Sequence, residues 1–270
     1  EDRRPAHFGT RVEHGVTLSS FNPADLPSPC FVLQEHRLRG NLAKIRQVRD
    51  AAGVEILLAL KGFAMARALP MIAKVADGAT ASSLNEARHA APVFAPNIHA
   101  YAPVYRDDQF DEMTRLCSHI TFNSIPQLEH FRGRAAGSSI GLRVNPEYAP
   151  VETDLYNPCA AGSRLGVKAE DLQAGLPPGV AGLHVHNLCE SGAAASAATI
   201  DSIERLYGHL LDDVQWLNLG GGHLMTRQGY RTDLLIDSLR ALRTRHPGLK
   251  VILEPGAAFV WETGVLVASV

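Results

Sequence analysis

Eight short apolar segments alternate with helix-like segments over most of this chain, and this alternation restricts the possible folds more than any other feature. The apolar segments are short and rich in β-branched residues, which is typical of strands in a parallel sheet. Parallel strands need long crossover connections, and the helix-like segments supply them. The predicted strands are residues 55–60, 79–82, 98–102, 120–122, 139–144, 182–187, 216–219 and 251–253.

The helix-like segments carry apolar residues three and four positions apart. They cover residues 34–52, 64–75, 84–91, 107–116, 125–135, 195–211 and 234–245. Eight strand-helix units are the number found in a (β/α)8 barrel, so we predict an α/β fold of the TIM barrel type. A chain of 270 residues with 46% apolar composition is long enough to build one such barrel.

Charge and residue spacing exclude several classes of partner. The formal net charge is -2 with acids and bases mixed, so no basic stripe for nucleic acid and no membrane-binding patch is predicted. No apolar run is long enough to span a membrane, and the polar residues 1–5 do not resemble a signal peptide, so we expect a cytoplasmic location. The four cysteines are widely spaced, and His184 and His186 have no acidic or thiolate cluster beside them, so no metal site is predicted.

Lys61 follows directly on the apolar residues 56–60, at the end of a predicted strand. Active sites of barrels gather at the carboxyl ends of the strands. A cation at the end of a buried strand is costly unless it is paired or deprotonated, and a desolvated lysine has the lowered pKa that attack on a carbonyl requires. Lys61 is therefore a candidate nucleophile, with a lysine that extends its stem to solvent as the alternative.

Three other strand ends carry residues suited to a cofactor. Gly220, Gly221 and Gly222 place backbone amides at a strand-to-loop turn, where they either wrap a phosphate or simply form a tight turn. His186 alternates with apolar residues, so it faces the barrel interior or mouth, either against an aromatic ring or as a hydrogen-bonded core residue. Glu254 is a carboxylate at the end of an apolar strand, and it needs a cationic partner such as a protonated pyridine nitrogen or an arginine.

A lysine, an imidazole, glycines and a carboxylate in this strand order are together the parts of a barrel that binds pyridoxal phosphate. The sequence resembles the alanine racemase/ornithine decarboxylase class of pyridoxal-phosphate enzymes, and within it the carboxynorspermidine (carboxyspermidine) decarboxylases. The resemblance runs from about residue 28 to the end, and the DLYNPC motif points to this branch. The motifs are LALKGFA at 58–64, ATASS at 79–83, NPEY at 145–148, DLYNPC at 154–159, SRLG at 163–166, GLHVH at 182–186 and LGGGH at 219–223.

The resemblance implies a cofactor and a reaction. It implies that Lys61 binds pyridoxal 5'-phosphate covalently, that His186 stacks on its ring and that the three glycines hold its phosphate. It further implies that Glu254 meets the pyridine nitrogen and that Arg164 lies near the cofactor oxygen. The implied reaction is decarboxylation of carboxynorspermidine or carboxyspermidine to norspermidine or spermidine, in polyamine biosynthesis.

The substrate is less strongly specified than the cofactor. Asp154, Tyr156 and Glu190 are candidate substrate-binding residues, because carboxylates can pair with the ammonium groups of a polyamine; solvation at the surface is the alternative role for such acids. Two other functions stay open. One is a different decarboxylase on the same barrel, of the diaminopimelate or ornithine type, and the other is a non-catalytic relative that binds pyridoxal phosphate.

The resemblance also implies a division of the chain. Residues 1–27 are expected to be an N-terminal arm belonging to a β-domain, residues 28–256 the barrel, and residues 257–270 the start of a C-terminal β-domain that is largely missing. The apolar strand at 265–270 either belongs to that sheet or pairs within this chain. A homodimer is expected. Ornithine decarboxylases carry a phosphate-binding arginine where this chain has Ala257, so another residue must replace it.

Overall fold

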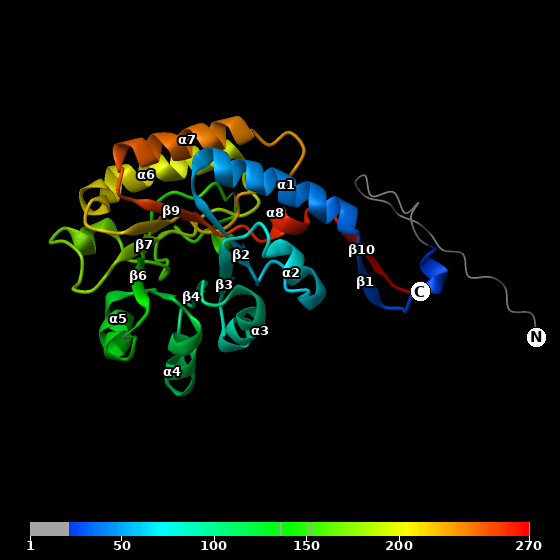
Figure 1. Cartoon of the computed structure of the whole chain (residues 1–270). Coiled ribbons are helices and arrows are strands. Elements are labelled where there is room, and N and C mark those ends of the chain that lie inside the picture. The colour runs from blue at the N-terminus through cyan, green and yellow to red at the C-terminus, as the bar shows by residue number, and fades with distance from the viewer. Residues whose placement is uncertain (1–21, 136, 152, 270) are drawn as a thin grey trace, which may run out of the picture.

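Eight parallel strands form a closed barrel with helices around it (Figure 1). The computed structural model describes residues 22–135, 137–151 and 153–269. The eight predicted strands are all present, so the predicted (β/α)8 barrel is confirmed. In barrel order they are β2 (Glu55–Ala59), β3 (Gly78–Ala81), β4 (Ile98–Tyr101), β5 (His119–Phe122), β6 (Ser139–Arg143), β7 (Gly182–His184), β8 (Trp216–Asn218) and β9 (Lys250–Leu253).

The helices lie on the outside of the barrel. Helices α1, α6 and α7 pack side by side on one side, and α3, α4 and α5 lie on the other (Figure 1). The predicted helix at 64–75 is shorter than expected. It begins as a 3-10 turn, and its α-helical part is a single turn in which Pro70 occupies one of the first two positions, where proline is tolerated. The helices are α1 (Glu35–Ala52), α2 (Leu69–Ile72), α3 (Leu84–Phe94), α4 (Asp107–Leu116), α5 (Ile125–Phe131), α6 (Ala193–Leu211), α7 (Thr232–Arg245) and α8 (Ala257–Val260).

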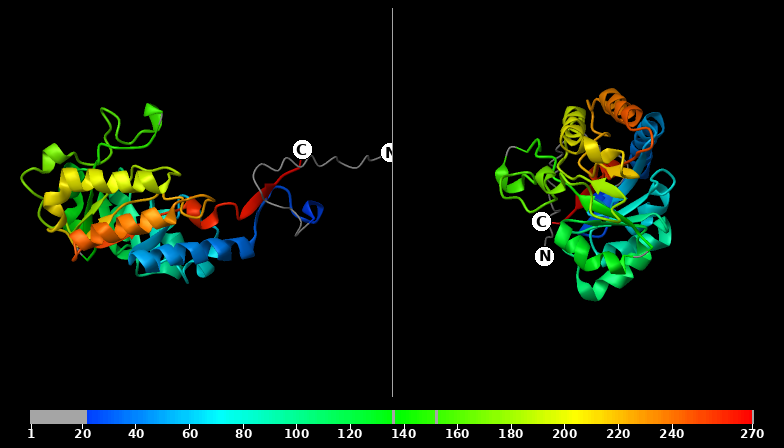
Figure 2. Two further views of the ribbon diagram at one scale, coloured as in Figure 1. Left: turned by 90° about the horizontal axis from the view of Figure 1, so that it is seen from above. Right: turned by 90° about the vertical axis from the view of Figure 1, so that its left-hand side faces the viewer.

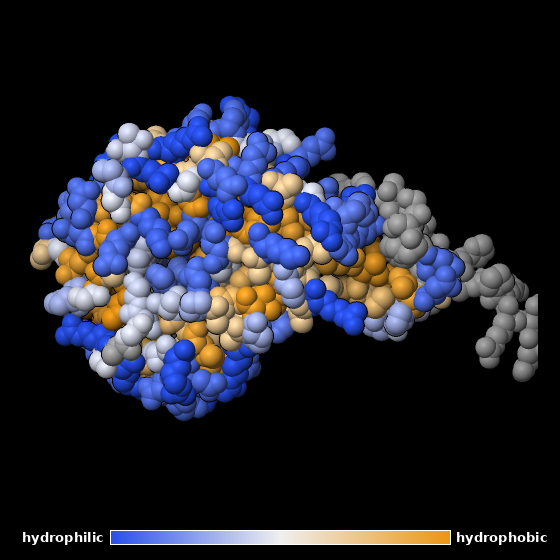
Figure 3. Space-filling view, viewed as in Figure 1, coloured by the Kyte–Doolittle hydropathy of each residue, from blue (hydrophilic) through white to orange (hydrophobic). Residues whose placement is uncertain are grey.

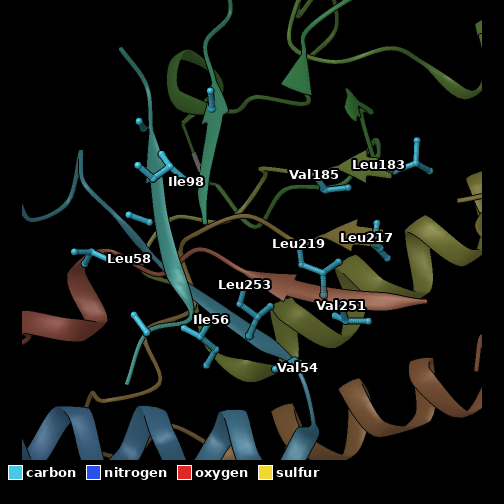
Figure 4. Packing of buried hydrophobic residues seen from close by; sticks show 14 of the residues in the cluster. Val54, Ile56, Leu58, Ile98, Leu183, Val185, Leu217, Leu219, Val251 and Leu253 are labelled. Atoms are coloured by element: carbon cyan, nitrogen blue, oxygen red, sulfur yellow. The ribbon is translucent and has the colours of Figure 1, made fainter. Parts of the chain in front are cut away.

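Side chains on the barrel strands alternate between the helical layer and the barrel interior. Leu183 and Leu217 belong to the main hydrophobic core, which fills the space between strands and helices (Figure 4). Trp216 belongs to a separate buried cluster with Leu57 and Ile252, from positions of the opposite parity. Residues two positions apart on a strand therefore share an environment, and this alternation sends polar side chains to the inside of the barrel.

Glycine at position 182 makes room for the indole of Trp216. A Cβ added at Gly182 would overlap the Trp216 ring. We expect Gly182→Ala to lower the free energy of unfolding by about 2 to 3 kcal/mol, measured by urea denaturation, because a packed interior resists an extra methyl group. Gly208→Ala is the control, since the same substitution in helix α6 meets open space. Equal stability of the two variants would contradict this account of the packing.

A two-stranded antiparallel ribbon stands beside the barrel. It pairs β1 (Cys30–Leu33) with β10 (Gly264–Val267), and it projects beyond α1 and α8, away from the barrel (Figure 2). Of the apolar strand predicted at 265–270, residues 265–267 pair within this chain, and residue 270 lies outside the described residues. Residues 1–21 of the expected N-terminal arm lie outside the described residues. The predicted division at residues 27 and 256 stays a prediction.

Candidate active site

A cavity of about 290 Å³ opens at the carboxyl ends of the barrel strands. Lys61 follows β2, Tyr101 ends β4, Arg143 ends β6 and His186 follows β7, and all four line this cavity. Two of the predicted site residues, Lys61 and His186, are thus brought together although they lie 125 positions apart in the sequence. The remaining lining residues are Ser82, Pro103, Val151, Tyr156, Pro158, Leu165, Asn187, Leu188 and Cys189.

Hydrogen bonds on both ring nitrogens of His186 define the protonation of the pair. The backbone N–H of Gly221 donates to Nδ1 of His186 at 3.1 Å, and Nε2 of His186 lies 3.1 Å from Nζ of Lys61. A neutral imidazole that accepts at Nδ1 carries its proton on Nε2. That proton points at the Lys61 nitrogen, which can accept it only as a neutral amine. The geometry therefore favours a neutral imidazole beside a deprotonated lysine.

Electrostatics agree with this assignment. Desolvation lowers the pKa of Lys61, and the positive charge of Arg143 lowers it further, while Glu254 acts in the opposite direction. Burial lowers the pKa of His186 to about 3, with Lys61 and Arg143 adding to the shift. The side chain of Lys61 is exposed to the open cavity. Its amine is thus accessible to a ligand while the surrounding walls disfavour its charge, as a nucleophilic lysine requires.

Glu254 follows β9 and is buried inside the barrel, with 5% of its surface exposed. Its Oε1 accepts a hydrogen bond from Nδ2 of Asn218 at 2.7 Å, and its Oε2 lies 3.7 Å from Nε2 of His184. Burial raises the pKa of Glu254, while the Asn218 hydrogen bond and Lys61 lower it. The structure offers this carboxylate no arginine partner among these contacts, which leaves room for a cation brought by a ligand.

Two backbone amides of the glycine loop after β8 donate hydrogen bonds within the protein. The N–H of Gly220 donates to Oδ1 of Asn218 at 2.9 Å, and the N–H of Gly221 donates to His186. Two of the three amides predicted to bind phosphate are therefore engaged within the protein, and the assignment of the three glycines to a phosphate stays a prediction. Gly222 instead lines a small hollow of about 20 Å³ together with Gly256 and Ala257.

Both the backbone conformation at position 222 and the atoms around it require a glycine there. Its φ is +88°, and an added Cβ would overlap the backbone carbonyl of Leu188. Gly229 has a φ of +77° but meets open space. We expect Gly229→Ala to cost about 1 kcal/mol for conformation alone and Gly222→Ala about 3 kcal/mol, because the overlap adds to the strain. Urea denaturation of both variants measures the difference, and equal costs would contradict the close packing of this loop.

Arg143 is a site residue that the sequence analysis missed. It is buried, its Nη1 donates to the Tyr101 hydroxyl, and its Nη2 donates to the carbonyl oxygen of His186 at 2.8 Å. Its guanidinium carbon lies 5.0 Å from the centre of the Tyr101 ring. The side chain of Arg164 is exposed and is not among the residues that line the cavity, and its predicted place near the cofactor stays a prediction. The detectable signal was an arginine ending the apolar strand β6.

The candidate substrate-binding residues are spread over two places. Tyr156 lines the cavity with 74% of its surface exposed. Asp154 begins the same 3-10 turn, η4 (Asp154–Tyr156). Glu190 has a φ of 45° and lines the small hollow beside Gly222, so the structure does not bring it to the cavity wall with Tyr156.

Two features are absent from the part of the chain that the structure describes. That part contains no group of three or more histidine, cysteine or acidic side chains that could hold a metal ion. It also contains no helix long and apolar enough to cross a membrane. The four cysteines are free thiols, and Cys189 lines the cavity.

The fold and the lysine-centred site define an enzyme of the TIM barrel class. No protein-family profile matches the chain. It is 49% identical over 265 residues to carboxyaminopropylagmatine decarboxylase of Synechocystis sp., covering 97% of this chain and 67% of that protein. It is 38% identical to carboxynorspermidine/carboxyspermidine decarboxylase of Campylobacter jejuni, covering 91% and 64% of the two chains.

A solved structure gives the same result. The crystal structure of carboxynorspermidine decarboxylase complexed with norspermidine, from Campylobacter jejuni, matches with a TM-score of 0.81 and 34% identity, covering 89% of this chain and 63% of that one. The chain therefore belongs to the family of carboxynorspermidine/carboxyspermidine and carboxyaminopropylagmatine decarboxylases, as the sequence resemblance indicated. It spans about two thirds of the length of these relatives.

Proposed function

We propose that this chain forms the barrel of a pyridoxal-phosphate-dependent decarboxylase that acts on a carboxylated polyamine. The observation that carries the proposal is the Lys61 amine, held 3.1 Å from His186 Nε2 in an open cavity whose surroundings favour its neutral form. A lysine in this state is the group that reacts with an aldehyde. Family membership gives the reaction class, and the retained lysine and buried carboxylate argue against a non-catalytic relative.

The residues present fit pyridoxal phosphate. Lys61 would hold its aldehyde carbon, Glu254 would hold its ring nitrogen, and the imidazole of His186 would lie beside its ring. The phosphate would lie against Gly222 at the opening of the small hollow that Gly256 and Ala257 also line, because these small residues let an anion approach the backbone. When bound, the cofactor supplies a ring that accepts the electron pair left by departing carbon dioxide.

The chain's own groups prepare this chemistry. The carboxylate of Glu254 stabilises a proton on any basic nitrogen placed beside it, because the carboxamide of Asn218 that donates to it carries no charge. His186 donates from Nε2 to the single lone pair of the neutral Lys61 amine, which holds the amine in the cavity; this hydrogen bond must open before the lone pair can attack a carbonyl. Arg143 holds His186 in place by donating to the backbone carbonyl oxygen of His186. Tyr101 in turn accepts from Arg143 and donates to Oδ1 of Asn123 at 2.9 Å.

The cavity wall supports a polyamine rather than a dicarboxylic substrate. A diaminopimelate-type substrate needs a cation for its distal carboxylate. Among the described residues that line the cavity, the basic side chains are Lys61 and Arg143; the Lys61 amine is neutral, and Arg143 is committed to Tyr101 and His186. Tyr156 and its apolar neighbours instead offer a surface for a methylene chain.

The substrates named for the relatives differ at the end that lies far from the carboxyl group. The assay must therefore compare these substrates with one another. We expect carbon dioxide release from carboxynorspermidine, carboxyspermidine or carboxyaminopropylagmatine, all of which carry a distal cation, and none from meso-diaminopimelate or ornithine. The ratio of kcat/KM values ranks the three polyamine substrates. Release from diaminopimelate alone would contradict the proposal.

We also expect a homodimer, as the family resemblance implies. An apolar groove of about 580 Å³ lies between the β1–β10 ribbon and the barrel, and Figure 3 shows hydrophobic residues gathered at this end of the molecule. Phe31 and Leu266, on opposite strands of the ribbon, are 76% and 58% exposed. Exposed apolar surface of this kind favours a protein contact.

A further inference from the structure

The carboxamide of Asn218 connects two separate parts of the candidate site. Asn218 ends β8 inside the barrel and is 2% exposed. Its Oδ1 accepts from the N–H of Gly220 at 2.9 Å, and its Nδ2 donates to Oε1 of Glu254 at 2.7 Å. One bond uses the amide oxygen and the other uses the amide nitrogen. If the amide were flipped, its NH2 group would face the N–H of Gly220 and its oxygen would face the carboxylate of Glu254, and both contacts would be unfavourable. The orientation of Asn218 is therefore fixed by its two partners.

We propose that Asn218 is a positioning residue that couples the glycine loop to the carboxylate of Glu254. In this arrangement one side chain sets both the phosphate end and the ring-nitrogen end of the site. What the two ends bind rests on the proposed function, but the coupling itself is a property of the chain.

Glu254 depends on Asn218 for its ionised form. The other groups that face Glu254 are Lys61, His184 and Thr80. The contact with His184 is 3.7 Å, too long for a hydrogen bond, and neither ring nitrogen of His184 has a hydrogen-bond partner among the described residues. Of the influences that oppose the effect of burial on the pKa of Glu254, the hydrogen bond from Asn218 is the largest. Loss of this donor would favour the protonated carboxyl group.

Gly220 depends on Asn218 for its backbone conformation. Its φ is +66°, and an added Cβ would overlap the carbonyl oxygen of Val185, so the turn is tightly confined. The N–H of Glu254 also donates to the carbonyl oxygen of Gly220 at 2.8 Å. Asn218, Gly220 and Glu254 thus form a closed ring of contacts. The next amide of the loop, that of Gly221, orients His186, so the ring also bears on Lys61.

Two variants separate the two bonds. Asn218→Asp keeps an oxygen for Gly220 and replaces the amide donor to Glu254, whereas Asn218→Leu removes both while keeping the same branching and number of side-chain heavy atoms. Asn97→Leu is the matched control, because Asn97 donates to the backbone oxygen of Asp77, before β3 at the opposite end of the barrel. The readouts are hydrogen exchange of the Gly220 amide and the titration of the Glu254 carboxyl carbon by NMR, with Glu254→Gln to assign the resonance.

In Asn218→Leu we expect Gly220 exchange to accelerate about tenfold, as loss of one hydrogen bond predicts, and Glu254 to titrate at higher pH. In Asn218→Asp we expect Gly220 protection to be retained while the Glu254 titration again moves upward. An unchanged Glu254 titration in both variants, or unchanged Gly220 exchange in Asn218→Leu, would overturn the coupling. These readouts need no cofactor, so failure of the proposed function appears separately, as absence of a pyridoxal adduct on Lys61.

Discussion

Replacing Lys61 with alanine should abolish decarboxylation, with a loss of at least about a thousandfold, and leave the fold intact. The expectation follows from the position of the amine, whose pKa is lowered by burial and which lines the cavity beside His186 as the candidate nucleophile. Carbon dioxide release in the presence of pyridoxal phosphate measures the effect. Thermal unfolding should show little change, because the Lys61 side chain fills no part of the core.

Lys74→Ala is the control for this experiment. Lys74 is exposed on the surface after α2, and it lines neither the cavity nor the hollow beside Gly222. This variant should retain the activity of the unchanged chain. Full activity in Lys61→Ala, or equal losses in both lysine variants, would exclude Lys61 as the reacting group.

Glu254→Gln should reduce turnover by about a hundredfold to a thousandfold while leaving stability unchanged or improved. The amide oxygen of glutamine can still accept from Asn218, so the local hydrogen bonding survives, but the negative charge is lost. Removing an uncompensated buried charge does not destabilise the fold, whereas a protonated ring nitrogen loses its counter-ion. The kcat of the variant and its midpoint of thermal unfolding test both parts.

The opposite pattern would contradict the role given to Glu254. A variant with normal kcat and a much lower midpoint of unfolding would show that the carboxylate serves the fold alone. Glu254→Asp provides a second comparison, because it keeps the charge but withdraws it from Asn218 by one methylene. We expect it to lose less activity than Glu254→Gln.

The barrel was predictable because its signals are local and repeated. Each strand shows a short apolar run, and the connections show helical spacing, so the number of strands followed from the sequence. The alternation of residues along β7 predicted that His186 faces the barrel interior or mouth, and His186 lines the cavity there. Lys61 was identifiable only together with the residues at the other strand ends, because a lysine at a strand end is by itself more often a solvated side chain. The helix at 64–75 was overextended because the effect of Pro70 depends on which turn it occupies.

The connections between strand ends were not predictable from single segments. The engagement of the Gly220 and Gly221 amides depends on Asn218 and His186, which contact the loop only when the barrel closes. Arg143 was overlooked because an arginine at the end of a strand is usually exposed, and only the closed barrel surrounds it with Tyr101 and the His186 backbone. Spacing along the chain therefore identified the reactive groups but not the contacts that set their protonation.

The most direct measurement is chemical labelling of the unchanged chain. The protein is incubated with pyridoxal phosphate, reduced with borohydride, digested and mapped by peptide mass. We predict one reduced pyridoxal group per chain, located on Lys61, even with the cofactor near equimolar. Labelling scattered over the surface lysines in proportion to their exposure, with Lys61 unmodified, would contradict the assignment of this barrel as a pyridoxal-phosphate enzyme.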